Sequence, residues 1–154
     1  MASITIDHLD REILRALEED SRISLVQLSE RIGLSATPCK RRVARLQETG
    51  LISGYSVAID RSVAGFGITA FVSVELDRTS ADQIADFQRH VALFDEVVAG
   101  TLMTGAQDFL LEVAVESLEE FDAFLQTKLM RFAGLRNVKS RFALRKFINR
   151  HRLP

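Results

Sequence analysis

A basic segment, Gly33–Leu46, contains Arg41 and Arg45, four residues apart. At about 100° per helical residue, these arginines share one side of a helix, and Cys39 and Val43 form an apolar stripe on another. A guanidinium group can donate two parallel hydrogen bonds to a guanine edge or a phosphate. This pattern is typical of the second helix of a helix-turn-helix, which lies in the DNA major groove.

Two further amphipathic helices are predicted before the basic one. Apolar residues recur at helical spacing from Leu9 to Leu17, in a helix opened by Asp7 or Asp10. A capping box beginning at Ser24 opens the second helix, which ends at Gly33. A basic helix on its own is most often solvated surface. Three short helices that share a core favour a helix-turn-helix instead.

The candidate DNA contacts lie in or just before the third helix. Thr37, Arg41 and Arg45 are the expected readers of bases or backbone, and Lys40 flanks them as a phosphate contact. Arg42 has two open interpretations, a phosphate contact or a bond within the domain. The full set of candidate DNA-contacting residues is Ser35, Thr37, Pro38, Lys40, Arg41, Arg42 and Arg45.

A small β-wing is expected after the third helix, because residues 51–59 alternate in polarity around Gly54. It would complete a winged helix-turn-helix over residues 1–60. Cys39 is the only cysteine, so no internal disulfide can form and a reducing compartment fits. Its place on the inward stripe favours a small core residue over a reactive thiol.

The second half of the chain follows a different pattern. Its predicted elements are a strand over Ile68–Leu76, a helix from Ser80, strands over Glu96–Thr104 and Phe109–Val115, a helix from Ser117 to Gly134, and a strand over Val138–Ile148. This order is the ferredoxin-like βαββαβ arrangement. We therefore predict an α+β protein with a linker at 61–67 and a second domain at 68–154.

One face of the predicted sheet has no helix to cover it. Two helices cover one face, and the opposite face is expected to carry five apolar residues: Phe71, Val98, Leu102, Leu110 and Ala114. Such a face is too apolar to remain in water, and a second copy of the chain would bury it. The pattern thus predicts a homodimer.

Charge is unevenly distributed along the 154 residues, although the net charge is −1. Residues 61–135 hold 5 basic and 12 acidic side chains, and residues 136–154 hold 7 and none. The basic tail from Arg145 to Arg152 could contact phosphate or simply be solvated. Charged residues interrupt every apolar run, and the N-terminus lacks a signal-peptide pattern, so we expect a cytoplasmic protein without membrane association.

The sequence contains no recognisable catalytic or metal-binding pattern. His8, His90 and His151 show no ligand spacing, and neither a glycine-rich phosphate loop nor a nucleophile motif occurs. We therefore expect no enzyme, no metal and no cofactor. The alternatives are a metabolite-binding interaction module without DNA readout, against which the outward Arg41 and Arg45 argue, and, least favoured, a small ferredoxin-like enzyme.

Motifs in both halves resemble those of the Lrp/AsnC family of feast/famine transcriptional regulators. They are Asp7-x-x-Asp10-x-x-Ile13-Leu14, Leu34-Ser35-x-Thr37-Pro38-Cys39, Gly50-x-Ile52-x-Gly54-Tyr55 and Thr104-Gly105-x-x-Asp108-Phe109-Leu110-Leu111. The resemblance covers about Ile6 to Ile148. It implies a regulator that binds double-stranded DNA, forms dimers and commonly octamers, and senses an amino acid between dimers. The implied effector contacts are Thr101, Met103, Thr104, Gly105 and Asp108, with Ser140 as a weaker one.

The chemistry of the 105–108 turn fits such an effector. An amino acid needs donors for its carboxylate and an acceptor for its ammonium, which backbone N–H groups near Gly105 and the Asp108 carboxylate could supply. From the residues alone, Gly105 could equally make the turn and Asp108 cap it. Ala106 stands where many relatives have an acidic or amide residue, which disfavours a basic effector such as lysine.

Overall fold

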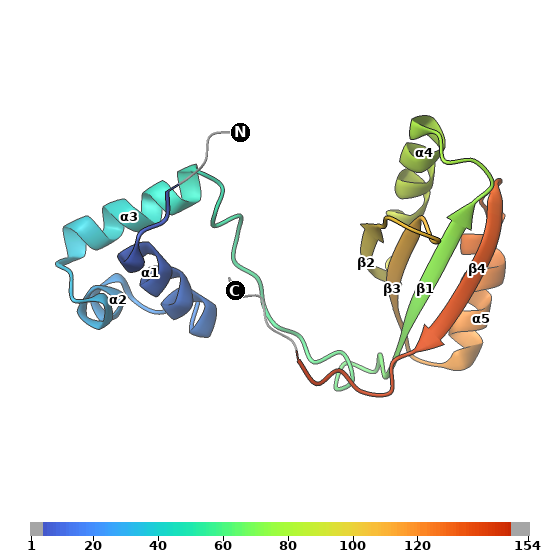
Figure 1. The fold of residues 1–154 in the computed structure, drawn as a ribbon. Helices are drawn as coiled ribbons and strands as arrows, with labels where there is room; N and C mark the ends of the chain where they lie inside the picture. Colours follow the sequence, from blue (N-terminus) through green and yellow to red (C-terminus); the bar gives the residue numbers. More distant parts are fainter. Residues whose placement is uncertain (1–4, 149–154) are drawn as a thin grey trace. The chain divides into compact units, whose positions relative to one another are not determined.

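The computed structural model describes residues 5–148 (Figure 1). The chain divides into two compact units, one ending at Ala58 and the other spanning Ile59–Phe147. The first, which we call the helical unit, contains three helices: α1 (His8–Glu19), α2 (Leu25–Ile32) and α3 (Ala36–Glu48). The three predicted helices are therefore confirmed.

Side-chain caps define where the first two helices begin. Asp7 caps α1 in a reciprocal box with Asp10, and Ser24 caps α2 in the same way with Gln27. α2 ends at Gly33, whose φ of 73° lies in the left-handed region that glycine adopts without steric strain. The turn between α2 and α3 is thus fixed by local sequence.

The core of the helical unit is small. Its fully buried apolar residues are Ile13, Ala16, Leu28, Cys39 and Leu46. Burial raises the pKa of the Cys39 thiol, which keeps it protonated. The prediction that Cys39 is a core residue is confirmed.

The predicted β-wing is not formed in the described chain. Residues 51–59 contain no strand, and residues 53–59 are all exposed. Alternating polarity yields a strand only where another backbone edge is available for pairing. The other elements of this unit are helices, whose backbone groups are already bonded internally.

The second unit, the sheet unit, has the βαββαβ order. Its elements are β1 (Ile68–Leu76), α4 (Ala81–Val91), β2 (Val97–Leu102), β3 (Phe109–Val115), α5 (Leu118–Thr127), a 3-10 turn (Leu129–Arg131) and β4 (Leu135–Phe142). The strands are antiparallel in the order β2-β3-β1-β4, so β2 and β4 form opposite edges (Figure 1). The predicted ferredoxin-like α+β fold is confirmed.

The last strand differs from the prediction in both limits. β4 begins at Leu135 and ends at Phe142, whereas Val138–Ile148 was expected. Phe142 pairs with Ala70, close to the start of β1, and Ala143 makes one more backbone bond, to Thr69. Beyond that point β1 offers no further partner. Residues 144–148 are accordingly exposed.

The two faces of the sheet differ in composition. Ala70, Val72, Val74 and Leu76 alternate onto the face that packs against α4 and α5, where they join the main core. The opposite face, which we call the open face, contains polar pairs: Arg141 donates to Ser73, and Asn137 donates to Glu75, each at 3.2 Å. It is therefore less apolar than predicted.

The predicted membership of the open face is partly wrong. Phe71, Leu110 and Ala114 lie on it. Leu102 instead pairs with Phe109 and so lies on the helix-covered side. The register of β2 shifts between Val97 and Ala99, and an irregularity of this kind changes which residues face each side.

Within residues 5–148, no helix is long and apolar enough to cross a membrane.

Candidate functional site

The first turns of α3 carry most of the predicted DNA contacts. Ser35, Thr37, Lys40 and Arg41 are exposed there, and Pro38 is half-buried. Cys39 and Leu46 are buried on the inner side of the helix. The apolar stripe therefore turns the polar and basic side chains outward, as its spacing predicts.

Ser35 occupies the N-cap position of α3, but its side chain makes no cap hydrogen bond. In α2, α4 and α5 the capping serine accepts from the backbone N–H of the third helical residue. In α3 that residue is Pro38, which has no N–H. The Ser35 hydroxyl is therefore available to a ligand.

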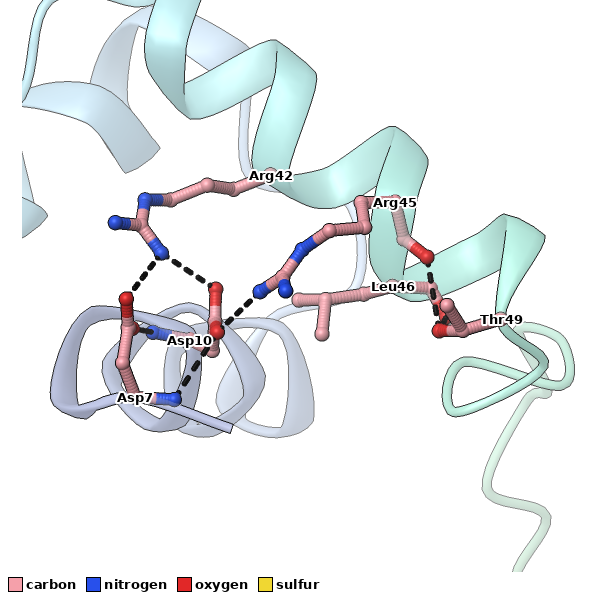
Figure 2. A network of polar contacts seen from close by, with 6 residues as sticks. All are labelled: Asp7, Asp10, Arg42, Arg45, Leu46 and Thr49. Carbon is pink, nitrogen blue, oxygen red and sulfur yellow. Dashed lines mark hydrogen bonds and ion pairs between the residues drawn. The ribbon is translucent and has the colours of Figure 1, made fainter. Parts of the chain in front are cut away.

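Two of the predicted DNA-contacting arginines are held by carboxylates at the start of α1, the N-cap Asp7 and Asp10 (Figure 2). Arg42 Nη1 donates to Asp7 Oδ2 at 2.6 Å and to Asp10 Oδ1 at 2.9 Å. Arg45 Nη2 donates to Asp10 Oδ2. We call these four residues the carboxylate–arginine network. Of the two interpretations of Arg42, the structure contains the bond within the domain.

Asp10 is the centre of this network and has no solvent exposure. Burial raises its pKa, but the hydrogen bonds from Arg45, the Asp7 backbone N–H and Arg42 together outweigh burial, so the net pKa is lowered. The carboxylate is thus ionised at neutral pH. The hydrogen bonds to Asp7 and then Asp10 raise the pKa of Arg42.

The network borders an open depression of about 470 Å³. Its lining residues are Thr5, Asp7, Asp10, Arg41, Arg42 and Arg45. Its three guanidinium groups and two carboxylates sum to a net charge of +1. A small anion can reach the arginines from this side.

The sequence predicts Asp7 or Asp10 as the residue that opens α1 and does not predict their pairing with arginines. A signal was present in the spacing. Asp7 and Asp10 are three residues apart at the start of one helix, and Arg42 and Arg45 are three residues apart on another. The two pairs therefore have the same spacing along their helices. The proximity of those faces was not predictable from spacing alone.

The predicted effector turn connects β2 and β3. Gly105 has a φ of 113°, in the region that favours glycine, and residues 101–106 are exposed. The turn is closed by Met103, whose N–H donates to the Asp108 carbonyl at 2.8 Å. The N–H of Met103 is therefore occupied, and the exposed backbone of residues 104–106 remains as the possible donor set.

Asp108 has a structural contact of its own. Its Oδ2 accepts a hydrogen bond at 2.7 Å from the backbone N–H of Leu76, a buried residue at the irregular end of β1. Asp108 therefore caps β1. The contact uses one carboxylate oxygen, so Oδ1 can still accept from an ammonium group.

Thr101 and Ser140 are not brought together within one chain. Thr101 is on β2 and Ser140 is on β4, at opposite edges of the sheet. Three strand intervals separate these edges, about 14 Å at the usual spacing. Ser140 also pairs with Val72 and so faces the helix-covered side, whereas Thr101 pairs with Leu110 on the open face.

Two protein-family models match the two halves of the chain. Residues 6–53 match a winged helix-turn-helix DNA-binding domain, and residues 69–153 match the Lrp/AsnC ligand binding domain. The chain belongs to the Lrp/AsnC family. Its fold and its domain order are those of Lrp/AsnC transcriptional regulators, and the predicted resemblance is confirmed.

Curated relatives of this Lrp/AsnC chain match over nearly their whole length. The Bkd operon transcriptional regulator of Pseudomonas aeruginosa is 37% identical over 97% of both chains. The leucine-responsive regulatory protein of Escherichia coli K12 is 34% identical over 88% of this chain and 82% of its own.

Solved structures give the same family. A Neisseria meningitidis transcriptional regulator in complex with L-Met superposes with a TM-score of 0.91 at 31% identity, covering 97% of both chains. An AsnC family transcriptional regulator from Agrobacterium tumefaciens superposes with a TM-score of 0.90 at 35% identity over 96% of both.

The remaining predictions concern metal binding and the basic tail. Within residues 5–148, no three His, Cys, Asp or Glu side chains cluster closely enough to hold a metal ion. In the predicted basic tail, Arg145 and Lys146 are exposed, and residues from 149 onward, including His151 and Arg152, lie outside the described part. The known members to which this Lrp/AsnC chain is similar are regulators of transcription.

Proposed function

We propose that this chain is a sequence-specific regulator of transcription whose DNA binding or assembly responds to a neutral amino acid. The observation that carries the DNA half is the start of α3, where Thr37, Lys40 and Arg41 are exposed on a helix fixed from behind by Cys39 and Leu46. A helix presented in this way fits the major groove.

The exposed residues of α3 take different roles in this proposal. Thr37 and Arg41 read base edges, and Lys40 and the free Ser35 hydroxyl contact phosphate. Arg45 contributes to base reading only when DNA draws it from Asp10. Arg42 contacts phosphate from the open depression.

The effector is proposed to bind at the turn between β2 and β3. Asp108 Oδ1 accepts from the ligand ammonium, and backbone N–H groups around Thr104 and Gly105 receive its carboxylate. Ala106 and the exposed Leu102 and Met103 favour an uncharged, apolar side chain. A relative named leucine-responsive and a neighbour solved with L-Met support this class.

Assembly belongs to the same proposal. The sheet unit forms a homodimer, and dimers associate further into an octamer in the cytoplasm. Thr101 completes the effector site within one chain, whereas Ser140 joins it only from a second copy, because the two lie on opposite edges of their own sheet. Double-stranded DNA and an amino acid are the proposed partners.

DNA binding is tested by titrating the protein onto its own upstream region at several salt concentrations. Each phosphate contact releases counterions, so the logarithm of affinity should fall by about 0.9 per contact per decade of salt. Arg41→Ala should weaken binding to this DNA, and Arg11→Ala, an exposed arginine on α1, serves as the matched control. A flat salt dependence, or equal binding by Arg41→Ala and wild type, contradicts the proposal.

The effector is tested with a thermal-shift screen of the twenty amino acids, since a ligand of the native state raises apparent stability. We expect leucine or methionine to raise the melting temperature and to change DNA affinity. Asp108→Asn keeps an acceptor for Leu76 but removes the charge that faces the ammonium, so it should lose the response. If every amino acid leaves stability, affinity and oligomer size unchanged, the effector half is wrong.

A further inference from the structure

The two carboxylates that contact Arg42 differ in exposure. Both accept from the same nitrogen, Nη1, but the Asp10 side chain is 0% exposed and the Asp7 side chain is 48% exposed. Asp10 also accepts from Arg45 and from the Asp7 backbone N–H. Asp10 is therefore a fixed anchor, and Asp7 is the outer partner of the pair.

The outer pair is the exchangeable one. An ion pair that water can reach contributes little, because solvent and salt screen it. Asp7 and Arg42 also border the open depression, which is lined by Arg41 and Arg45 as well. A phosphate that enters this depression meets the Arg42 guanidinium beside Asp7, its exposed carboxylate partner.

A phosphate oxygen and a carboxylate oxygen satisfy a guanidinium in the same way, through charge-assisted N–H donors. On this basis, and resting on the proposed DNA binding, we infer that Asp7 competes with a DNA phosphate for Arg42. The Asp7 carboxylate occupies Arg42 in the free protein and is displaced when DNA binds. It thereby weakens binding to every DNA sequence alike.

The cap at α1 allows a clean test. Asp7→Asn removes the charge, but asparagine caps helices as well as aspartate does, so the bond to the Asp10 N–H is retained. We expect this variant to bind the upstream DNA about two- to fivefold more tightly for each domain on the DNA. The salt slope should steepen by about 0.9 for each domain.

Random DNA of the same length should gain by the same factor, because phosphate contacts carry no sequence information. Asp7→Ser, a second neutral cap, should reproduce the gain. In an Arg42→Gln background, Asp7→Asn should have no effect. Glu18→Gln is the matched control, since Glu18 is an exposed carboxylate near the other end of the same helix.

The outcomes separate the inference from the function on which it rests. If wild type binds DNA with a steep salt dependence while Asp7→Asn gains nothing, the inference is wrong and the proposed function stands. A gain that persists with Arg42→Gln, or that Glu18→Gln reproduces, also overturns it, because the effect would then be general charge. A wild-type chain that binds no DNA overturns both.

Discussion

The helical unit and the sheet unit are stabilised in different ways. The sheet unit buries thirteen apolar residues in one cluster, and the helical unit buries five. In the smaller unit, the hydrogen bonds between the buried Asp10 and its two arginines add stability that the small apolar core does not supply. The same arginines border the proposed DNA surface, so there stability and binding depend on shared side chains. In the sheet unit, the core is joined to the candidate site through the hydrogen bond from the Leu76 N–H to Asp108.

Deleting a large core side chain should unfold the sheet unit first. Phe124 is 1% exposed and lies near the rings of Phe94 and Phe121. Phe124→Ala should lower the free energy of unfolding by about 3–5 kcal/mol. Amide hydrogen exchange should show the loss in the sheet unit and leave α1 to α3 protected. The exposed Phe147 is the control, and Phe147→Ala should stay within about 0.5 kcal/mol of wild type.

Neutralising Asp10 should produce the opposite pattern. Asp10→Asn removes hydrogen bonds between a buried charge and two arginines, and we expect the helical unit to lose about 2–3 kcal/mol. Asp86→Asn breaks an exposed pair with Arg89 and should cost less than about 1 kcal/mol. Equal losses for the two variants would remove the distinction between the units.

Asp108 tests whether a candidate site in the sheet unit also supports the fold. Asp108→Ala leaves the buried Leu76 N–H without its acceptor and should lower unfolding free energy by about 1–3 kcal/mol. Asp108→Asn keeps a carbonyl oxygen and should remain closer to wild type in denaturant titrations. If both variants unfold like wild type, the hydrogen bond to Leu76 contributes nothing measurable.

The smallest effect should appear in acid. The pKa of Asp10 is lowered in the folded state, so its contribution is present above the unfolded value of about 3.9 and is lost as pH falls through the lower folded value. The helical unit should therefore weaken below about pH 4. Asp10→Asn should remove this part of the pH dependence. In the sheet unit, burial raises the pKa of Glu96, but the hydrogen bond and charge of Lys128, together with a backbone hydrogen bond, outweigh burial, so the net pKa is lowered. The acid stability of the sheet unit must therefore be measured separately.

The features that were predicted correctly from the sequence are those set by interactions within a few residues. The capping box at Ser24, the inward stripe of Cys39 and the strand Phe109–Val115 match the structure, because caps and periodicity act within a few residues. The predicted end of β4 was wrong, because the end of this strand depends on where its partner β1 begins, about seventy residues earlier in the chain. A strand therefore ends where its partner does, whatever its own polarity.

The candidate sites divide along the same line. The exposure of Thr37 and Arg41 follows from helical spacing. The engagement of Arg45 by Asp10 and of Asp108 by Leu76 does not, since each joins residues more than thirty positions apart. The charged groups are visible in the sequence, but only the fold shows which of them are already paired.

Pro38 has a consequence for how such a regulator can diverge. Since it removes the N–H that a capping serine would use, Ser35 does not hold α3 in place. Replacing Ser35 should therefore spare the fold, whereas replacing Ser24 or Ser117 removes a working cap, typically worth about 1 kcal/mol. Position 35 is thus free to vary under selection for stronger or weaker DNA binding without a prior stabilising change elsewhere.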